Sequence, residues 1–144
     1  MPGDKIFLDT NVLIYSYDVS AEKKHERAKT IMTDLWDSGR GILSTQILEE
    51  FFVNITKKVS KPLDVKRAKD IIEDLLKWEV VIIDGGSLLE AIEIHVRYKC
   101  SFWDSLVLHA AQKGGASLLL SEDLQDGQTV NGVKIKNPFI HSTL

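Results

Sequence analysis

The sequence predicts an α/β domain with a mainly parallel central sheet. Short apolar runs at residues 5–8, 41–44, 80–83 and 117–121 alternate with longer segments in which apolar residues recur at helical spacing. This alternation is typical of strand–helix–strand units, whose strands run parallel. The 144 residues, 44% of them hydrophobic, suffice for a single domain spanning residues 1–144 with a substantial core.

The first strand ends in an acid. Residues 6–8 are apolar and precede Asp9, and a short helix is expected to follow from about residue 11. Ser20 is expected to cap the next helix, and Gly39 and Gly41 to end it. A very short strand at residues 41–44 then leads into a helix whose predicted apolar face comprises Ile47, Leu48, Phe51, Phe52 and Ile55.

The middle of the chain predicts two more helices around a strand. Asp64 is a suitable cap for a helix that continues to about Leu76. Residues 80–83 form a β-branched run bounded by Asp84 and two glycines, which predicts a central strand. Ser87 and Glu90 have the spacing of a capping box at the start of the following helix.

The last third predicts a helix, a strand and a hairpin. Trp103 shares helical spacing with Leu106, Val107 and two alanines, so it is expected on the apolar face of its helix. A buried strand is expected at residues 117–121. The Asn-Gly pair at residues 131–132 is the usual signal of a two-residue hairpin turn, so an edge hairpin is expected after that strand.

Composition narrows the function classes. No apolar run approaches the roughly 18 residues that cross a membrane, and the N-terminus shows no secretory pattern, so a cytoplasmic location without membrane attachment is expected. Cys100 is the only cysteine, which excludes an intrachain disulfide and a cysteine-based zinc site. The net charge of −3 does not indicate nucleic-acid binding, but it is compatible with a cluster of acids that binds a metal ion.

Several acids lie near strand ends, and each has an ordinary explanation when taken alone. Asp9 can cap a helix, Asp104 lies three residues after Ser101 in capping-box spacing, and Asp123 can belong to a turn. Glu49 and Glu50 flank the apolar face of their helix on opposite sides, so helical geometry does not decide which of them points toward the strand ends.

Taken together, these acids predict a cation site. Ligands of open parallel sheets gather at the carboxyl ends of the strands. Carboxylates that converge there would repel one another unless they were protonated or held a cation. Oxygen-rich sites suit Mg²⁺ or Mn²⁺, which can activate water and neutralise charge on a phosphate.

Four segments of the chain resemble, in their sequence order, the motifs of PIN-domain ribonucleases. Within this family, the resemblance is to the VapC-like toxins of type II toxin–antitoxin modules. The segments are Asp9-Thr10-Asn11-Val12-Leu13, residues 44–51, Phe102-Trp103-Asp104-Ser105 and Leu120-Ser121-Glu122-Asp123. The resemblance covers nearly the whole chain. It implies a three-layer α/β/α sandwich and an acidic site that binds Mg²⁺ or Mn²⁺.

The resemblance also implies site residues and partners. Its catalytic acids fall on Asp9, Glu50, Asp104 and Asp123, of which Asp9, Asp104 and Asp123 are expected to bind the metal. Asn11, Ser121 and Asp126 match supporting positions. The implied substrate is RNA, and a homodimer and a cognate antitoxin are the implied protein partners.

Two other functions compete with this interpretation. Haloacid-dehalogenase-like phosphatases also begin with a strand that ends in Asp, but they need a second Asp where this chain has Asn11. A non-catalytic module that uses metal for stability is the other alternative. Basic residues for RNA contact are expected among Lys57, Lys58, Lys61, Lys66, Arg67 and Lys69, or at Arg97 and Lys99, although such charges are usually only solvated.

Overall fold

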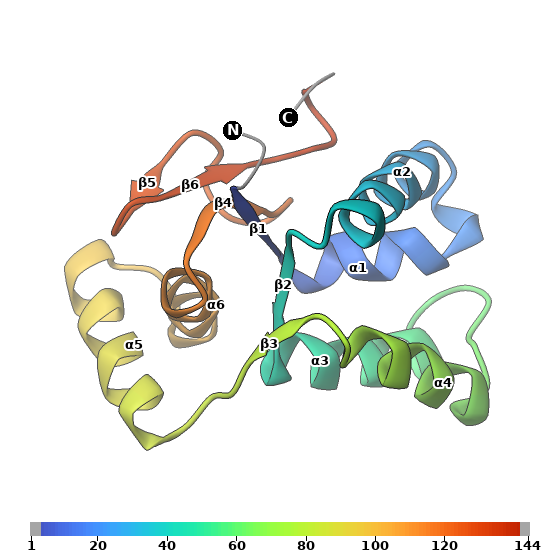
Figure 1. The fold of residues 1–144 in the computed structure, drawn as a ribbon, viewed down its shortest axis with the longest axis horizontal. Helices are drawn as coiled ribbons and strands as arrows, with labels where there is room; N and C mark the ends of the chain where they lie inside the picture. The colour runs from blue at the N-terminus through green and yellow to red at the C-terminus, as the bar shows by residue number, and fades with distance from the viewer. Residues whose placement is uncertain (1–3, 142–144) are drawn as a thin grey trace.

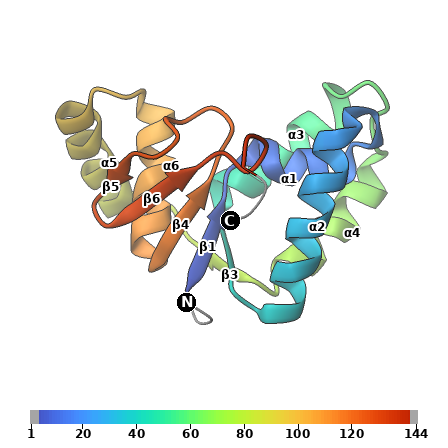
Figure 2. The ribbon, with the colours of Figure 1, turned by 90° about the horizontal axis from the view of Figure 1, so that it is seen from above.

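A twisted sheet lies between two groups of helices, which makes the three-layer α/β/α arrangement (Figures 1 and 2). The computed structural model describes residues 4–141. Within them the strand order is β3-β2-β1-β4-β6-β5, and only the β5–β6 pair is antiparallel. The strands are β1 (Lys5–Leu8), β2 (Gly41–Ser44), β3 (Glu79–Val81), β4 (Ala116–Leu120), β5 (Thr129–Val130) and β6 (Val133–Lys136).

Helices lie on both sides of the sheet (Figure 1). The first group is α1 (Thr10–Tyr17), α2 (Lys23–Ser38), α3 (Thr45–Lys57) and α4 (Val65–Leu75), and the second is α5 (Gly85–Tyr98) and α6 (Phe102–Lys113). A short 3₁₀ helix, η1 (Val19–Ala21), joins α1 to α2. Both groups pack on a core that includes the fully buried Phe7, Phe51 and Leu119.

β1 lies in the interior of the sheet, and Asp9 at its carboxyl end lies beside Ser121 at the end of β4. The Asp9 N–H donates to the Leu120 carbonyl at 3.0 Å, so the residue after β1 stays beside the end of β4. The Ser121 N–H donates to the Lys136 carbonyl at 3.1 Å. These bonds extend the parallel pairing by one residue and bring the side chains of Asp9 and Ser121 together, as parallel strands do at their carboxyl ends.

The connection around α2 differs from the prediction at both ends. Ser20 belongs to η1, which Asp18 caps, and α2 begins after Glu22 at an unusual positive φ of 57°. Gly39 ends α2 in the left-handed conformation, as predicted. Gly41 instead opens β2, where a Cβ atom would lie 2.3 Å from the Trp78 ring, so the close packing of that ring requires glycine.

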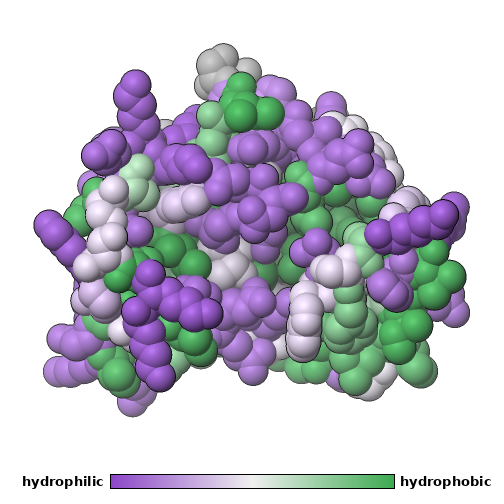
Figure 3. All heavy atoms as spheres, turned by 180° about the vertical axis from the view of Figure 1, so that it is seen from behind, coloured by the Kyte–Doolittle hydropathy of each residue, from purple (hydrophilic) through white to green (hydrophobic). Residues whose placement is uncertain are grey.

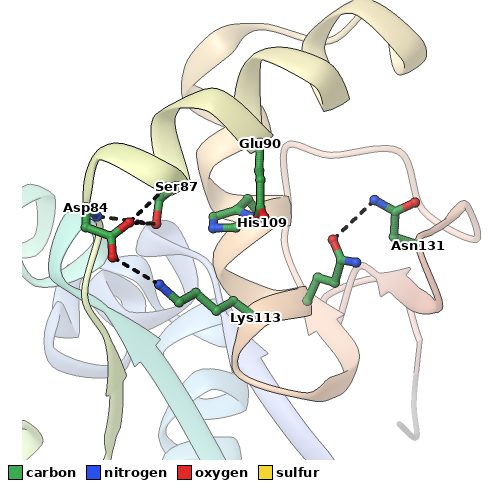
Figure 4. A network of polar contacts seen from close by, with 7 residues as sticks. Asp84, Ser87, Glu90, His109, Lys113 and Asn131 are labelled. Carbon is green, nitrogen blue, oxygen red and sulfur yellow. Dashed lines mark hydrogen bonds and ion pairs between the residues drawn. The ribbon is translucent and has the colours of Figure 1, made fainter.

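Two predictions on the α5 side are wrong. The run at residues 80–83 ends as the edge strand β3, not a central strand, and Ile82 beyond it is 61% exposed. The capping box of α5 pairs Ser87 with Asp84 rather than with Glu90. Figure 4 shows that Glu90 instead reaches His109 on α6, where its Oε2 lies 3.0 Å from Nδ1. Lys113 Nζ lies 3.5 Å from Asp84, so polar contacts tie α5 to α6 at two points.

The outer face of α5 carries an uncovered apolar stripe. Leu88, Ile92 and Val96 are exposed at i, i+4 and i+8, with Leu89 beside them. Seen from behind, apolar surface gathers over this end of the molecule, at the lower right of Figure 3. Within residues 4–141, no helix has the length and apolar character needed to cross a membrane.

Candidate active site at the carboxyl ends of the strands

A pocket of about 280 Å³ opens where the carboxyl ends of β1 and β4 meet the first turns of α1, α3 and α6. All four predicted catalytic acids line it, although they come from four separate segments of the chain. The lining residues are Asp9, Thr10, Asn11, Ile14, Gln46, Glu50, Asn54, Trp103, Asp104, Val107 and Asp123.

Asp9 is the most enclosed of the four acids, with 8% of its surface exposed. Its Oδ1 accepts the Thr10 N–H at 2.8 Å, so it caps α1, and its Oδ2 accepts the Ser121 hydroxyl at 2.8 Å. Burial, together with the smaller effect of the nearby charges of Asp123 and Glu50, raises the pKa of Asp9 from 3.8 to about 6 despite these two hydrogen bonds. Asp9 therefore caps α1 and also lines the acidic pocket.

Glu50, and not Glu49, faces the pocket. Its Oε1 accepts the Thr10 hydroxyl at 2.6 Å, whereas Glu49 is exposed outside the pocket. Gln46 and Asn54 lie one turn before and one turn after Glu50, so three polar residues share one face of α3. The sequence did not lead us to predict Thr10, Gln46 or Asn54 as site residues. The i, i+4, i+8 spacing of Gln46, Glu50 and Asn54 could have indicated two of them.

Asp104 reaches the pocket from the first turn of α6. The Ser101 hydroxyl caps this helix by accepting the Asp104 N–H at 3.0 Å, which confirms half of the predicted capping arrangement. Trp103 was expected on the buried face of the helix, but it is 65% exposed and lies on the pocket wall beside Asp104. The periodicity failed here because the helix begins at Phe102, and its first turn projects beyond the core.

Ser121 organises the turn that carries Asp123. Its hydroxyl oxygen accepts the N–H groups of Asp123 and Leu124 at 3.2 and 3.1 Å while its proton goes to Asp9. Asp126 does not line the pocket. It accepts the Asn137 N–H at 2.8 Å and lies 3.0 Å from His141 Nε2, so it holds the C-terminal segment instead.

The donor set of the pocket fits a hard divalent cation. Besides the carboxylates, two residues that line the pocket, Asn11 and Gln46, each have a buried side-chain oxygen with no hydrogen-bond partner among the described residues. Buried acceptors without a partner are costly, and a cation or its water would satisfy them. No three His, Cys, Asp or Glu side chains in residues 4–141 already form a close metal cage. Mg²⁺ is commonly bound through one or two carboxylates and retains several waters, so it does not need such a cage.

Solved structures with the same fold include toxin–antitoxin complexes. A FitAB complex bound to a DNA fragment aligns with a TM-score of 0.69 at 17% identity, over 95% of this chain and 97% of that one. A toxin–antitoxin complex from Klebsiella pneumoniae gives 0.67 at 18%, over 93% and 98%. VapC20 from Mycobacterium tuberculosis, described as a sarcin-ricin loop cleaving toxin, gives 0.60 at 20%, over 80% and 87%.

Sequence comparison assigns the family. A search of curated protein sequences gives no match. The sequence profile of the PIN domain matches residues 6–125, which include β1 with Asp9, the α3 acid, the Trp-Asp pair of α6 and Asp123. The match therefore covers most of the chain and every acid of the pocket, and the chain belongs to the PIN domain family.

Proposed function

We propose that this protein is a metal-dependent ribonuclease and the toxin of a toxin–antitoxin pair. The observation that carries the proposal is the convergence of Asp9, Glu50, Asp104 and Asp123 on one pocket that also holds unpaired amide oxygens. Carboxylates brought together in this way repel one another and lower the stability of the fold, and they suit a cation that acts on phosphates. Membership of the PIN domain family supports this chemistry.

Each acid has a distinct part in the proposal. Asp9, Asp104 and Asp123 hold the cation, which is Mg²⁺ or Mn²⁺, and Asn11 Oδ1 supports it. Glu50 completes the negative pocket, and the Thr10 hydroxyl fixes its position through the 2.6 Å hydrogen bond. Ser121 orients both Asp9 and the turn that carries Asp123.

The reaction is hydrolysis of an RNA phosphodiester bond. When held by Asp9, Asp104 and Asp123, a divalent cation would supply positive charge for the phosphate and would lower the pKa of water. Water adds to phosphorus in line with the departing 3′-oxygen, and the products are a 5′-phosphate and a 3′-hydroxyl. The protein's own contribution is to orient the phosphate against the wall formed by Asp104 and Trp103 and to keep the acids in place.

The protein partners are proposed from the same relatives. Several similar structures are complexes of a toxin with an antitoxin, two of them described as DNA-bound. We expect this chain to bind a cognate antitoxin and to form a homodimer. Sedimentation of the protein alone, and with the product of the adjacent reading frame, measures both associations.

The test is cleavage of single-stranded and structured RNA with Mg²⁺ or Mn²⁺, repeated in EDTA. Asp104→Asn removes one charge with little change of shape and should abolish cleavage without unfolding the chain. Asp34→Asn is the matched control, because Asp34 is exposed on α2 and outside the pocket. RNA left intact by the wild-type protein with either metal would disprove the proposal.

The alternatives make different predictions in the same assay. A phosphatase of the haloacid-dehalogenase type would trap a phosphate mimic on Asp9 and leave RNA intact. Asn11 occupies the position of its second Asp and cannot act as the acid–base group. A non-catalytic module would gain stability from the metal without cleaving RNA. The family assignment supports neither alternative.

A further inference from the structure

A second cavity, of about 410 Å³, lies between the start of α2 and the C-terminal segment. Figure 2 shows the chain after β6, in red, returning toward α1 and α2. The cavity is lined by basic side chains, a proline and one aromatic ring, and no carboxylate lines it among residues 4–141. The lining residues are Lys23, Lys24, Arg27, Pro138, Phe139 and His141.

Two of the basic groups are already neutralised. Lys24 Nζ forms an ion pair with Glu122, and His141 lies 3.0 Å from Asp126. Lys23 has no ion-pair partner in the described part of the chain. Arg27 donates from Nε to the Pro138 carbonyl at 3.1 Å, and its Nη2 is buried with no acceptor among residues 4–141. The cavity therefore holds uncompensated positive charge, and a buried donor without an acceptor is costly.

The start of α2 adds to this positive potential. No side chain caps the helix N-terminus, so its first N–H groups lack a side-chain acceptor. Lys23 and Lys24 stand in the first turn, where the helix dipole disfavours cations and favours anions. Glu26, the acid of that turn, does not line the cavity. An anion in the cavity would relieve both unfavourable features.

Contacts of two adjacent residues, Glu122 and Asp123, link the wall of this cavity to the acidic pocket. Glu122 binds Lys24 and accepts the Tyr15 hydroxyl at 2.7 Å, while the next residue, Asp123, lines the acidic pocket. α1 also links the two sites, because Asn11 lines the pocket and Tyr15 packs edge-on, at 5.2 Å between centroids, against Phe139, which lines the cavity. These contacts place the basic cavity beside the acidic pocket.

We propose that this basic cavity binds a backbone phosphate of the RNA strand next to the cleavage site, through Lys23 and Arg27. This inference rests on the proposed ribonuclease function. The cavity is a phosphate subsite that positions the strand without reading its sequence. It also offsets the repulsion between the RNA and the acidic pocket, which the overall charge of −3 cannot do.

The experiment measures binding of a labelled single-stranded oligoribonucleotide by the full chain in EDTA, over a range of salt concentrations. Lys23→Gln removes an exposed, unpaired charge and should weaken binding about fivefold at low salt, and the slope of log K against log salt should fall by about 0.7. Arg27→Gln should act in the same direction, with its folding checked by thermal unfolding. Lys29→Gln is the matched control, because at 100° per residue Lys29 faces away from the cavity on the same helix. It should bind within about twofold of wild type.

Cleavage kinetics give an independent readout, in which Lys23→Gln should raise KM about fivefold and leave kcat unchanged. Wild-type affinity, salt slope and KM in both cavity variants would overturn the subsite while the ribonuclease function stands. A wild-type protein that neither binds nor cleaves RNA would overturn both. A polyglutamate peptide is the second probe. If the cavity variants lose affinity for the peptide and keep their affinity for RNA, the cavity binds an acidic protein segment and the RNA proposal is wrong.

Discussion

Replacing Asp9 by Asn should make the metal-free protein more stable at neutral pH. Burial raises the pKa of Asp9 from 3.8 to about 6 in the folded chain. The folded state therefore favours the protonated carboxyl. Its contribution to stability is fully present below pH 3.8 and is lost as the pH rises to about 6. A shift of this size corresponds to about 3 kcal/mol, of which about 2.5 kcal/mol separates pH 4 from pH 7.5.

Asn cannot repeat every contact of the carboxylate. The Thr10 N–H and the Ser121 hydroxyl both donate to Asp9, and Asn offers one acceptor oxygen in place of two. The loss of one hydrogen bond costs about 1 kcal/mol at every pH. Asp9→Asn should therefore be slightly less stable than wild type at pH 4 and about 1 to 2 kcal/mol more stable at pH 7.5.

Urea unfolding in EDTA, followed by circular dichroism at both pH values, measures this difference. Glu49→Gln is the control, because it removes an exposed carboxylate that lies outside the pocket. Mn²⁺ should reverse the order of stability, because it stabilises the wild-type pocket by mass action and binds Asp9→Asn more weakly. An Asp9→Asn effect that is equal at pH 4 and pH 7.5 would refute the assignment of a buried, destabilised carboxylate.

Two further predictions follow from contacts on either side of the pocket. Glu50→Gln should lower the rate of RNA cleavage at least about tenfold, because it removes the negative charge of a side chain that Thr10 holds in the pocket. Glu49→Gln should leave the rate unchanged. Equal rates in the two variants would contradict the placement of Glu50. Gly41→Ala should cost about 1 to 3 kcal/mol of unfolding free energy because its Cβ would meet the Trp78 ring at 2.3 Å. The control Gly86→Ala, at an exposed position of α5 where a Cβ would lie 3.4 Å from Asp84 Oδ1, should be neutral or stabilising, and thermal unfolding measures both.

The acidic pocket could be predicted because its residues follow from topology. Asp9 and Asp123 come after strands that pair in parallel, and parallel strands present their carboxyl ends at one edge. Asp104 begins the helix that leads into β4, so its position near that edge follows from the same topology. The choice of Glu50 over Glu49 needed the structure or the resemblance, because it depends on how α3 is rotated about its axis.

Other features of the structure could not be predicted from the local sequence pattern. The edge position of β3 depends on strand order, which a β-branched run does not encode. The exposure of Trp103 depends on where α6 leaves the core. The basic cavity joins residues 23–27 to residues 138–141, which are more than 100 positions apart in the sequence. In each case the missing information is a long-range contact.

The energetic cost of the acidic pocket is itself an argument for a bound ligand. A buried Asp9 with a raised pKa, a buried Asn11 Oδ1 and a buried Gln46 Oε1 without partners among residues 4–141 each cost stability, and all three residues line the same pocket. Apolar replacements would remove all three costs, so stability alone does not explain the arrangement. A divalent cation with its water would offset these costs, because it would favour the ionised carboxylate and could offer a partner to the amide oxygens.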